Sequence, residues 1–179
     1  MLDLQNCQKI KTSIRIEIAA KADIEILARV EIESKLRSYP EYNDADGVDY
    51  DNRLHQWITY FNGETPVSAR SERIVFKALK GEHVVGLIAG HLTNRYGKNA
   101  EIQKLYILKE EQRKGIASDL LKSLLTWLFR HHAKSLCVGI DPENPYQKFY
   151  IKYGGLHLNS HWIYWDDLAE VEQRLKVYR

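Results

Sequence analysis

Early in the chain, apolar and polar positions alternate, and the pattern then changes to a helical period. Within Ser13–Ile18, isoleucine occupies positions 14, 16 and 18, and this two-residue period predicts a half-buried strand. Over Asp23–Arg37 apolar residues recur at near-helical spacing, as in an amphipathic helix. A loop rich in Asp, Asn and Tyr follows, and the apolar spacing within Leu54–Phe61 predicts a second helix that ends near Gly63.

Strand-like runs dominate the middle of the chain. Arg73–Lys80 and His83–Thr93 are two such runs, and the Gly-Glu step between them is a hairpin signal. Ala100–Leu108 is a third run of the same kind. A polar turn leads from it into Ile116–His131, whose leucines and aromatic residues predict a strongly buried helix.

The last part of the chain alternates short strands and helices. We expect a strand over Ser135–Ile140, a short helix near Pro145–Tyr153 and one strand over Leu156–Trp165, after which Asp166 and Asp167 begin an amphipathic helix. Hairpins first and alternating elements afterwards predict an α/β (α+β) fold, with helices on the faces of a mixed sheet. The length of 179 residues predicts a single domain over 1–179.

Composition narrows the class of protein. Hydrophobic residues make up 44% and charged residues 28%, as in ordinary globular proteins. The net charge of +2 and the lack of a basic stripe argue against nucleic-acid and membrane partners. No segment of the sequence resembles a signal peptide or is apolar enough to span a membrane, so we expect a cytoplasmic protein. Cys7 and Cys137 form no CxxC pair, and we expect no metal.

The segment before the helix at Ile116 carries the most chemistry. Gln112–Ala117, QRKGIA, places two cations and a glycine directly at the predicted helix start. Unpaired N–H groups and the helix dipole make such a start a good phosphate site, and Gly115 lets the backbone approach an anion. A basic turn that merely caps a helix would look the same. P-loop, dinucleotide-fold, zinc-protease and hydrolase motifs are absent from the sequence.

The order of elements and the segment AEIQKLYILKEEQRKGIASDLL resemble the GNAT superfamily of N-acetyltransferases. The family signature Q/R-x-x-G-x-G/A after the fourth strand is matched by Gln112, Gly115 and Ala117. A second family block, which runs from an Asn through an FY pair to a Gly, is matched over Asn144–Gly154. Two mild departures are Gln112 where many members have Arg, and Gly155 where Phe often ends the second block.

The resemblance implies a GNAT-like, mostly antiparallel sheet whose fourth strand bulges and splays from the fifth. The pantetheine arm of acetyl-CoA would lie in this gap, bonded to the backbone of Leu105 and Ile107, with the pyrophosphate at the turn. Asn144 would contact the arm, or serve only as a helix cap. The cofactor contacts implied in this way are Leu105, Tyr106, Ile107, Gln112, Arg113, Lys114, Gly115, Ile116, Ala117, Ser118, Asn144 and Tyr150.

Three residues receive catalytic roles from the resemblance. The Leu105 amide would stabilise the oxyanion that develops on the thioester. Glu101 matches a position that serves as general base in some members, and the alternative is a strand carboxylate paired with Lys or Arg. Tyr150 matches the family's general acid, and the alternative is a packed helix aromatic.

The leading hypothesis is direct transfer of acetyl from acetyl-CoA to a primary amine of a small molecule or peptide, in a ternary complex. A non-catalytic module that senses acyl-CoA or binds a partner, and an enzyme that acetylates protein lysines or N-termini, stay open as alternatives. Five acidic residues within Ser38–Asp51, counting Asp51, either attract a cationic amine or form a solvated loop. The resemblance is also compatible with a homodimer.

Overall fold

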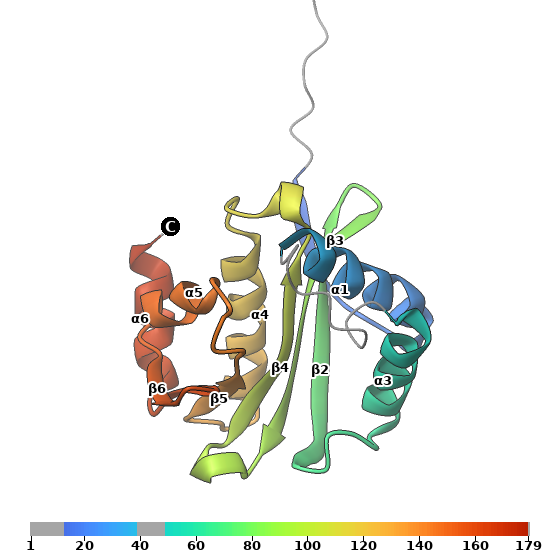
Figure 1. Ribbon diagram of the computed structural model, residues 1–179. Helices are drawn as coiled ribbons and strands as arrows, with labels where there is room; N and C mark the ends of the chain where they lie inside the picture. The colour runs from blue at the N-terminus through green and yellow to red at the C-terminus, as the bar shows by residue number, and fades with distance from the viewer. Residues whose placement is uncertain (1–12, 39–48, 179) are drawn as a thin grey trace, which may run out of the picture.

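A seven-stranded sheet organises the part of the chain that the computed structural model describes, residues 13–38 and 49–178. Neighbouring strands follow the order β1-β2-β3-β4-β5-β7-β6 (Figure 1). The strands are β1 (Ile14–Ile18), β2 (Ala69–Lys80), β3 (His83–Thr93), β4 (Ala100–Ile107), β5 (Leu136–Gly139), β6 (Leu156–Asn159) and β7 (Trp162–Trp165).

Helices and short 3₁₀ turns connect these strands. The α-helices of the described residues are α1 (Ile24–Ser38), α3 (Tyr50–Asn62), α4 (Ile116–Arg130), α5 (Gln147–Lys152) and α6 (Leu168–Val177), and the 3₁₀ turns are η1 (Lys21–Asp23), η2 (Arg95–Gly97) and η3 (Lys109–Glu111). The predicted helices are therefore confirmed. Gly63 ends α3 in a left-handed conformation, and the Asp167 carboxylate caps α6 by accepting from the Ala169 amide at 2.8 Å.

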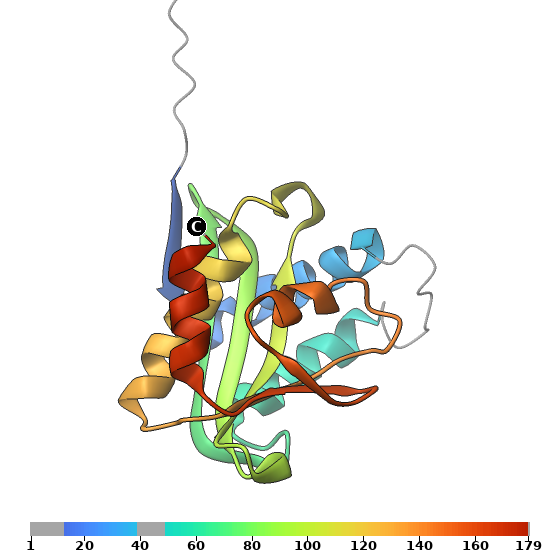
Figure 2. The same ribbon diagram turned by 90° about the vertical axis from the view of Figure 1, so that its left-hand side faces the viewer.

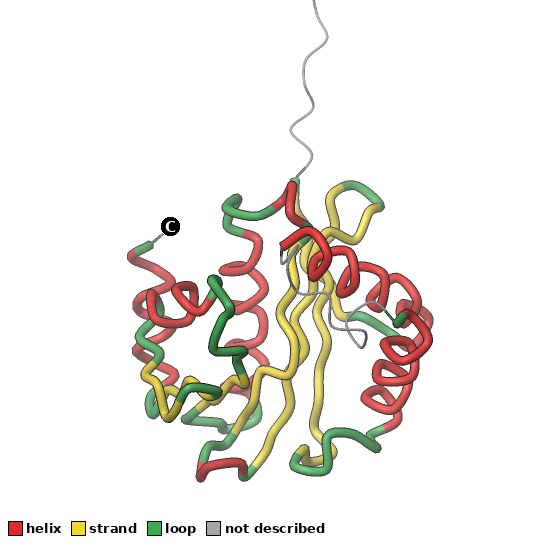
Figure 3. The backbone as a smooth tube through the Cα atoms, viewed as in Figure 1, coloured by secondary structure: helices red, strands yellow, loops and turns green. Residues whose placement is uncertain are grey.

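Helices cover both faces of the sheet, as expected. Figure 1 shows α1 and α3 on one side and α4 and α6 on the other, Figure 2 looks onto the α4 side, and Figure 3 shows the helices flanking the strands. The leucines of α4 pack with strands and α6 in one apolar cluster. A second cluster joins α1 and α3 to the opposite face around Trp57. Because β3 lies between the two clusters, every residue from Val85 to Thr93 is buried.

The strands run antiparallel to their neighbours except at one place. β4 and β5 are parallel, and α4 forms the crossover between them. β4 and β5 pair over only three positions, from Ala100–Leu136 to Ile102–Val138. Gln103 has no partner on β3, because the register passes from Gly90–Ile102 directly to Ala89–Lys104. The bulge in β4 and its splay from β5 are thus confirmed.

The prediction of one strand over Leu156–Trp165 was wrong. This segment is the hairpin β6–β7, because the Asn159 side chain accepts from the His161 amide at 2.9 Å and folds the chain into a turn. β2 also begins at Ala69, earlier than the predicted start at Arg73. Neither difference moves the gap between β4 and β5.

Candidate active site

A cavity of about 790 Å³ lies where β4 and β5 separate. One edge is Gln103–Ile107 of β4 and the other is the segment Val138–Ile140, which begins in β5. The turn before α4 and the helix α5 contribute further walls. The predicted site residues that line the cavity are Leu105, Tyr106, Ile107, Gln112, Arg113, Gly115, Ile116, Ala117, Ser118, Asn144 and Tyr150.

The cavity is lined from both faces of the sheet. Leu105 packs against the cluster of α4, whereas Tyr106 packs against the cluster of α1 and α3. Residues 34–36 of α1 and residues 116–118 of α4 both contribute to the wall. Two halves on opposite faces of the sheet therefore meet at the gap beside β4.

The backbone of β4 turns a free edge toward this gap. The Leu108 amide donates to the Val85 carbonyl at 2.9 Å. In an antiparallel pair the backbone groups of every second residue point to the neighbouring strand, so Tyr106 and Lys104 also form backbone hydrogen bonds with β3. Leu105 and Ile107 fall between these positions. Their N–H and C=O groups consequently face the side from which β5 has separated.

The Gln112 side chain reaches back to this edge. Its Nε2 donates to the Ile107 carbonyl at 3.1 Å. Gln112 therefore ties the start of the turn to the end of β4, and the Ile107 carbonyl has a partner within the chain.

The turn from Arg113 to Gly115 has a left-handed backbone at both ends. The φ angles are 61° at Arg113 and 87° at Gly115. The Ser118 and Asp119 amides donate to the Gly115 carbonyl at 3.0 and 3.1 Å, so the preceding amides lie ahead of the first hydrogen-bonded turn of α4. A Cβ at Gly115 would meet no atom of the described residues within 4 Å. Backbone donors, the helix dipole and open space coincide here.

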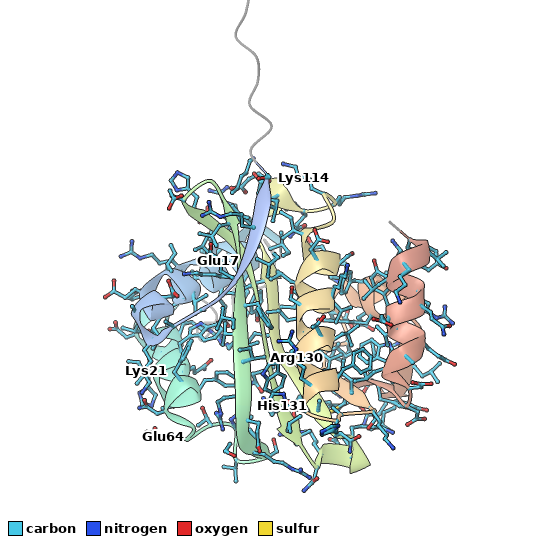
Figure 4. All side chains as sticks on the ribbon, turned by 180° about the vertical axis from the view of Figure 1, so that it is seen from behind. Glu17, Lys21, Glu64, Lys114, Arg130 and His131 are labelled. Carbon is cyan, nitrogen blue, oxygen red and sulfur yellow. The ribbon has the colours of Figure 1, made fainter. Side chains whose placement is uncertain are left out.

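Lys114 lies outside the cavity wall. Its Nζ is 3.1 Å from Glu111 Oε2, and Lys80 Nζ is 2.6 Å from Glu111 Oε1. The hydrogen bond from Lys80 keeps the pKa of Glu111 below its usual value, although burial opposes it. Figure 4 shows Lys114 at the edge of the molecule, far from Arg130 and His131 at the other end of α4. The cation of the turn that lines the cavity is Arg113.

Tyr150 lines the cavity from α5. Its ring packs edge-on against Phe149 and Trp165, with centroids 5.5 and 6.0 Å away. The residue is 9% exposed, and burial raises the pKa of its hydroxyl above the usual value. The hydroxyl therefore stays protonated at neutral pH and can donate a hydrogen bond.

Two polar side chains hold α5 in place beside the cavity. Asn144 Oδ1 accepts from the Tyr146 amide at 2.7 Å and forms a turn ahead of α5, whose N-cap is Tyr146, so Asn144 is not the helix cap of its alternative interpretation. Ser118 Oγ lies 2.7 Å from the Tyr153 hydroxyl and links α4 to α5. Contacts of Asn144 and Ser118 with a cofactor stay predictions.

Glu101 lies on the paired part of β4 and does not line the cavity. It is 5% exposed, and Arg95 Nε donates to its Oε2 at 2.9 Å. His91 faces it across the sheet, with Nε2 3.6 Å from the same oxygen. This geometry favours the ion-paired strand carboxylate over the general base.

The sequence motifs name none of the residues that form the wall on the α1 side. Lys104 Nζ is 2.8 Å from both carboxylate oxygens of the fully buried Glu31 on α1, and Arg53 Nη1 is 3.3 Å from Oε1. Burial lowers the pKa of Lys104, and Glu31 opposes that shift. Ser34 Oγ and Gln103 Oε1, which belong to lining residues, are buried without a hydrogen-bond partner among the described residues.

The acidic segment named above lies mostly outside the described residues, including Glu41, Asp44 and Asp46. Asp49 caps α3 by accepting from the Asn52 amide at 3.1 Å. Within residues 13–38 and 49–178, no group of three or more His, Cys, Asp or Glu side chains is placed to hold a metal ion. No helix of the same residues has the length and apolar character needed to cross a membrane.

Comparisons with known proteins support an acetyltransferase. The family model described as "Acetyltransferase (GNAT) family" matches residues 29–154. An uncharacterised N-acetyltransferase of Bacillus subtilis, YuaI, is 26% identical over 177 residues, which cover 90% of this chain and 98% of that protein.

Solved structures share the fold. The PaiA N-acetyltransferase of Thermoplasma acidophilum, in complex with coenzyme A, superposes with a TM-score of 0.66 at 19% identity, covering 85% of this chain and 97% of that one. An acetyltransferase of Thermus thermophilus gives 0.67 at 17% identity, covering 86% and 96%. The expected fold and the expected use of acetyl-CoA are both confirmed at the level of the family.

Proposed function

Because this chain belongs to the GNAT family of acetyltransferases, we propose that it moves acetyl from acetyl-CoA directly to a primary amine, in a ternary complex. The observation that carries the proposal is that the turn before α4, the free edge of β4 and Tyr150 all line the same cavity. A cavity common to all three can hold donor and acceptor side by side. The name of the Bacillus subtilis relative supports nitrogen as the acceptor atom.

The turn before α4 fits the pyrophosphate of coenzyme A. The open space at Gly115, the amides ahead of the first turn and the Arg113 guanidinium all suit a doubly charged anion. We assign the pyrophosphate to Gln112–Ser118, with Lys114 adding charge from outside the wall.

The free edge of β4 fits the pantetheine arm. The N–H and C=O groups of Leu105 both face the gap. Ile107 contributes its amide, because its carbonyl already accepts a hydrogen bond from the Gln112 side chain. Tyr106 and Asn144 complete this part of the wall.

Bound acetyl-CoA supplies an acyl group that is activated as a thioester. The Leu105 amide faces the gap and is assigned to the thioester oxygen, where it donates a hydrogen bond that strengthens as charge develops. The contribution of such a donor to the rate is about 100-fold or more.

Tyr150 is assigned to the leaving sulfur. The C–N bond forms, the C–S bond breaks, and the Tyr150 hydroxyl donates its hydrogen bond to the sulfur that takes the electron pair. The amine loses one proton and the thiol gains one, so the reaction balances without a further reactant. A buried hydroxyl that stays protonated at neutral pH suits this task.

Two measurements test the proposal. Isothermal titration is expected to detect coenzyme A binding, and a thiol-detecting assay is expected to detect coenzyme A release from acetyl-CoA when primary amines are added. Absence of binding at millimolar coenzyme A would falsify the proposal. Binding without turnover on any amine would instead favour the non-catalytic module.

The same assay separates small acceptors from proteins. Small primary amines and lysine-containing or free N-terminal peptides are compared at equal concentration. Turnover restricted to peptides would identify a protein acetyltransferase, and inert peptides would exclude it.

A further inference from the structure

The α1 side of the cavity contains two buried polar atoms that the described residues leave without a hydrogen-bond partner. These are Ser34 Oγ and Gln103 Oε1, and both residues line the cavity. Buried polar groups in folded proteins are almost always bonded. A group that has no partner in the chain and borders a cavity is suited to receive its partner from a ligand.

The bulge places Gln103 at the point where the sheet divides. Ile102 packs in the α4 cluster, so its neighbour Gln103 takes the opposite, α1 face of the sheet. The extra residue lets Lys104 take that face too, as its bond to Glu31 shows. Gln103 follows the last residue paired with β5 and lies two positions before Leu105.

The ion pair between α1 and β4 brings Ser34 to the same region. Ser34 lies one helical turn after Glu31 on α1, and Gln103 directly precedes Lys104 on β4. The Glu31–Lys104 contact therefore holds both polar residues on the α1 side of the gap. A ligand bound there lies next to the Leu105 amide, to which we assigned the reacting thioester.

The charges around this region do not favour an ammonium ion. No carboxylate from β4 or α1 lines the cavity among the described residues, since Glu31 is enclosed and bonded to Lys104 through both oxygens. The ionisable groups around the region are Glu31 and Lys35 on α1, Arg53 on α3, Lys104 and Tyr106 on β4, Asp141 after β5 and Tyr150 on α5. Glu111 of η3 lines the same cavity, and its carboxylate is paired with Lys80 and Lys114. Asp141 lies across the gap, where its Oδ1 accepts from the Glu143 amide at 2.9 Å.

We infer that Gln103 and Ser34 form the subsite for the acceptor, and that this subsite binds a primary amine in its uncharged form. Gln103 Oε1 accepts one N–H of the amine, and Ser34 Oγ accepts the other. Lys104, Arg53 and Lys35 surround the single carboxylate of Glu31, and this excess of positive charge on the α1 side favours a neutral amine over an ammonium ion. The subsite thus selects the nucleophilic form without a carboxylate at its wall. This inference rests on the proposed function.

Binding of amines to the complex of the protein with coenzyme A tests the inference without turnover. Propylamine, ethanolamine and benzylamine are titrated against the coenzyme A-saturated protein, with thermal shift or calorimetry as the readout. An alkylamine has a pKa of about 10, so its neutral fraction rises about tenfold from pH 7.5 to 8.5. The apparent Kd is expected to fall about tenfold over this step. A Kd that is unchanged or rises with pH, or no binding of any of the three amines, overturns the inference.

Three variants sharpen the test. Gln103→Leu and Ser34→Ala remove polar atoms that have no hydrogen-bond partner among the described residues, so the melting temperature is expected to stay or rise while the amine Kd increases about tenfold or more. Gln103→Glu is expected to abolish or reverse the pH dependence, because a carboxylate favours the ammonium form. The control Ser123→Ala removes a hydroxyl on α4 that donates to the Asp119 carbonyl of the same helix, away from the cavity. It is expected to change neither the amine Kd nor the coenzyme A Kd.

The outcomes separate this inference from the proposed function. Intact coenzyme A binding and acetyl transfer, with unchanged amine affinity in both Gln103→Leu and Ser34→Ala, would overturn the subsite and leave the proposed function standing. If Gln103→Leu does not fold, Ser34→Ala and Gln103→Glu decide by the same criteria. Loss of coenzyme A binding in the unmodified protein is the result that removes the proposed function itself.

Discussion

The Tyr150 hydroxyl is the single group whose removal affects the proposed reaction most directly. Tyr150→Phe keeps the ring contacts with Phe149 and Trp165 and removes only the hydroxyl. We expect kcat to fall about 100-fold or more, since general acids contribute rate factors of this order. The KM for acetyl-CoA is expected to change little. Initial rates of thiol release on the best amine of the screen measure both constants.

The pH profile gives a second readout for Tyr150. Burial raises its pKa, so the proton-donating form persists to higher pH than the usual tyrosine value of about 10. The rate should therefore show no alkaline fall from this group below that pH. Tyr164→Phe on β7, outside the cavity wall, is the control and is expected to stay within about twofold of the unmodified rate. A Tyr150→Phe enzyme of normal rate contradicts the assignment.

Single residues show where prediction from sequence succeeds and where it stops. Gln112, Gly115 and Tyr150 were found because they stand in local motifs of fixed spacing, and all three line the cavity. Ser34 and Gln103 belong to no motif. Their role depends on the contact of Lys104 with Glu31, 73 positions away in sequence, which no local pattern encodes. Glu101 was named by position alone, and its pairing with Arg95 depends on the fold of η2.

The turn that begins α4 provides a prediction at the scale of an element. Gly115→Glu places a carboxylate in the open space assigned to the pyrophosphate, at a φ of 87° that disfavours side chains. We expect a stability loss of about 1–2 kcal/mol and a loss of coenzyme A affinity of at least about 100-fold. Urea unfolding and isothermal titration measure the two effects.

Gly97→Glu is a matched control for this variant. Gly97 has a φ of 70°, also has open space around its Cβ position, and lies in η2 away from the cavity. It should lose similar stability and keep full coenzyme A affinity. Equal affinity in both variants would mean that the pyrophosphate binds elsewhere.

The pairing of α1 with β4 leads to a prediction about stability. Glu31 is fully buried among Lys104, Arg53 and Lys35, so Glu31→Gln leaves buried cations without their shared carboxylate. We expect a loss of about 3–5 kcal/mol in the free energy of unfolding. Chemical denaturation measures it. The exposed Glu172→Gln, which breaks an ion pair on the surface of α6, should cost less than about 1 kcal/mol. A similar loss in both variants would contradict the prediction.

Helices and strands were predictable where the periodic pattern of apolar residues was long enough to be recognised. The leucines of α4 and the two long strands of the β2–β3 hairpin gave such signals. The β6–β7 turn did not, because it contains neither Gly nor Pro and is formed by the Asn159 side chain. The early start of β2 was missed because Ala69–Glu72 is largely polar and exposed. Both errors concern segments with little burial to impose a pattern.

For the whole molecule, the sheet shared by both apolar clusters predicts one cooperative unfolding transition. Coenzyme A binding across the gap should raise the midpoint of that single transition. At a ligand concentration of 100 times Kd the gain is about 2.7 kcal/mol, or roughly 5–10 °C for a chain of this size. Far-UV circular dichroism and tryptophan fluorescence should give the same midpoint. Two transitions, of which only one shifts, would contradict the single-domain prediction.

The extra residue at Gln103 has a consequence for how the family's chains can vary in length. Side chains on a strand alternate, so one inserted residue exchanges the two faces for everything that follows it, unless a bulge absorbs that residue. If Gln103 took a regular position in the pairing instead of bulging, Lys104 would enter the apolar layer under α4, and Leu105 would move to the side now occupied by the ion pair. The two halves of the site keep their sides of the sheet because the bulge in β4 absorbs the extra residue. A length change of one residue between Ala100 and Ile107 should therefore be tolerated only where the bulge absorbs it, as in a deletion of Gln103, which leaves Lys104 and Leu105 on their present faces.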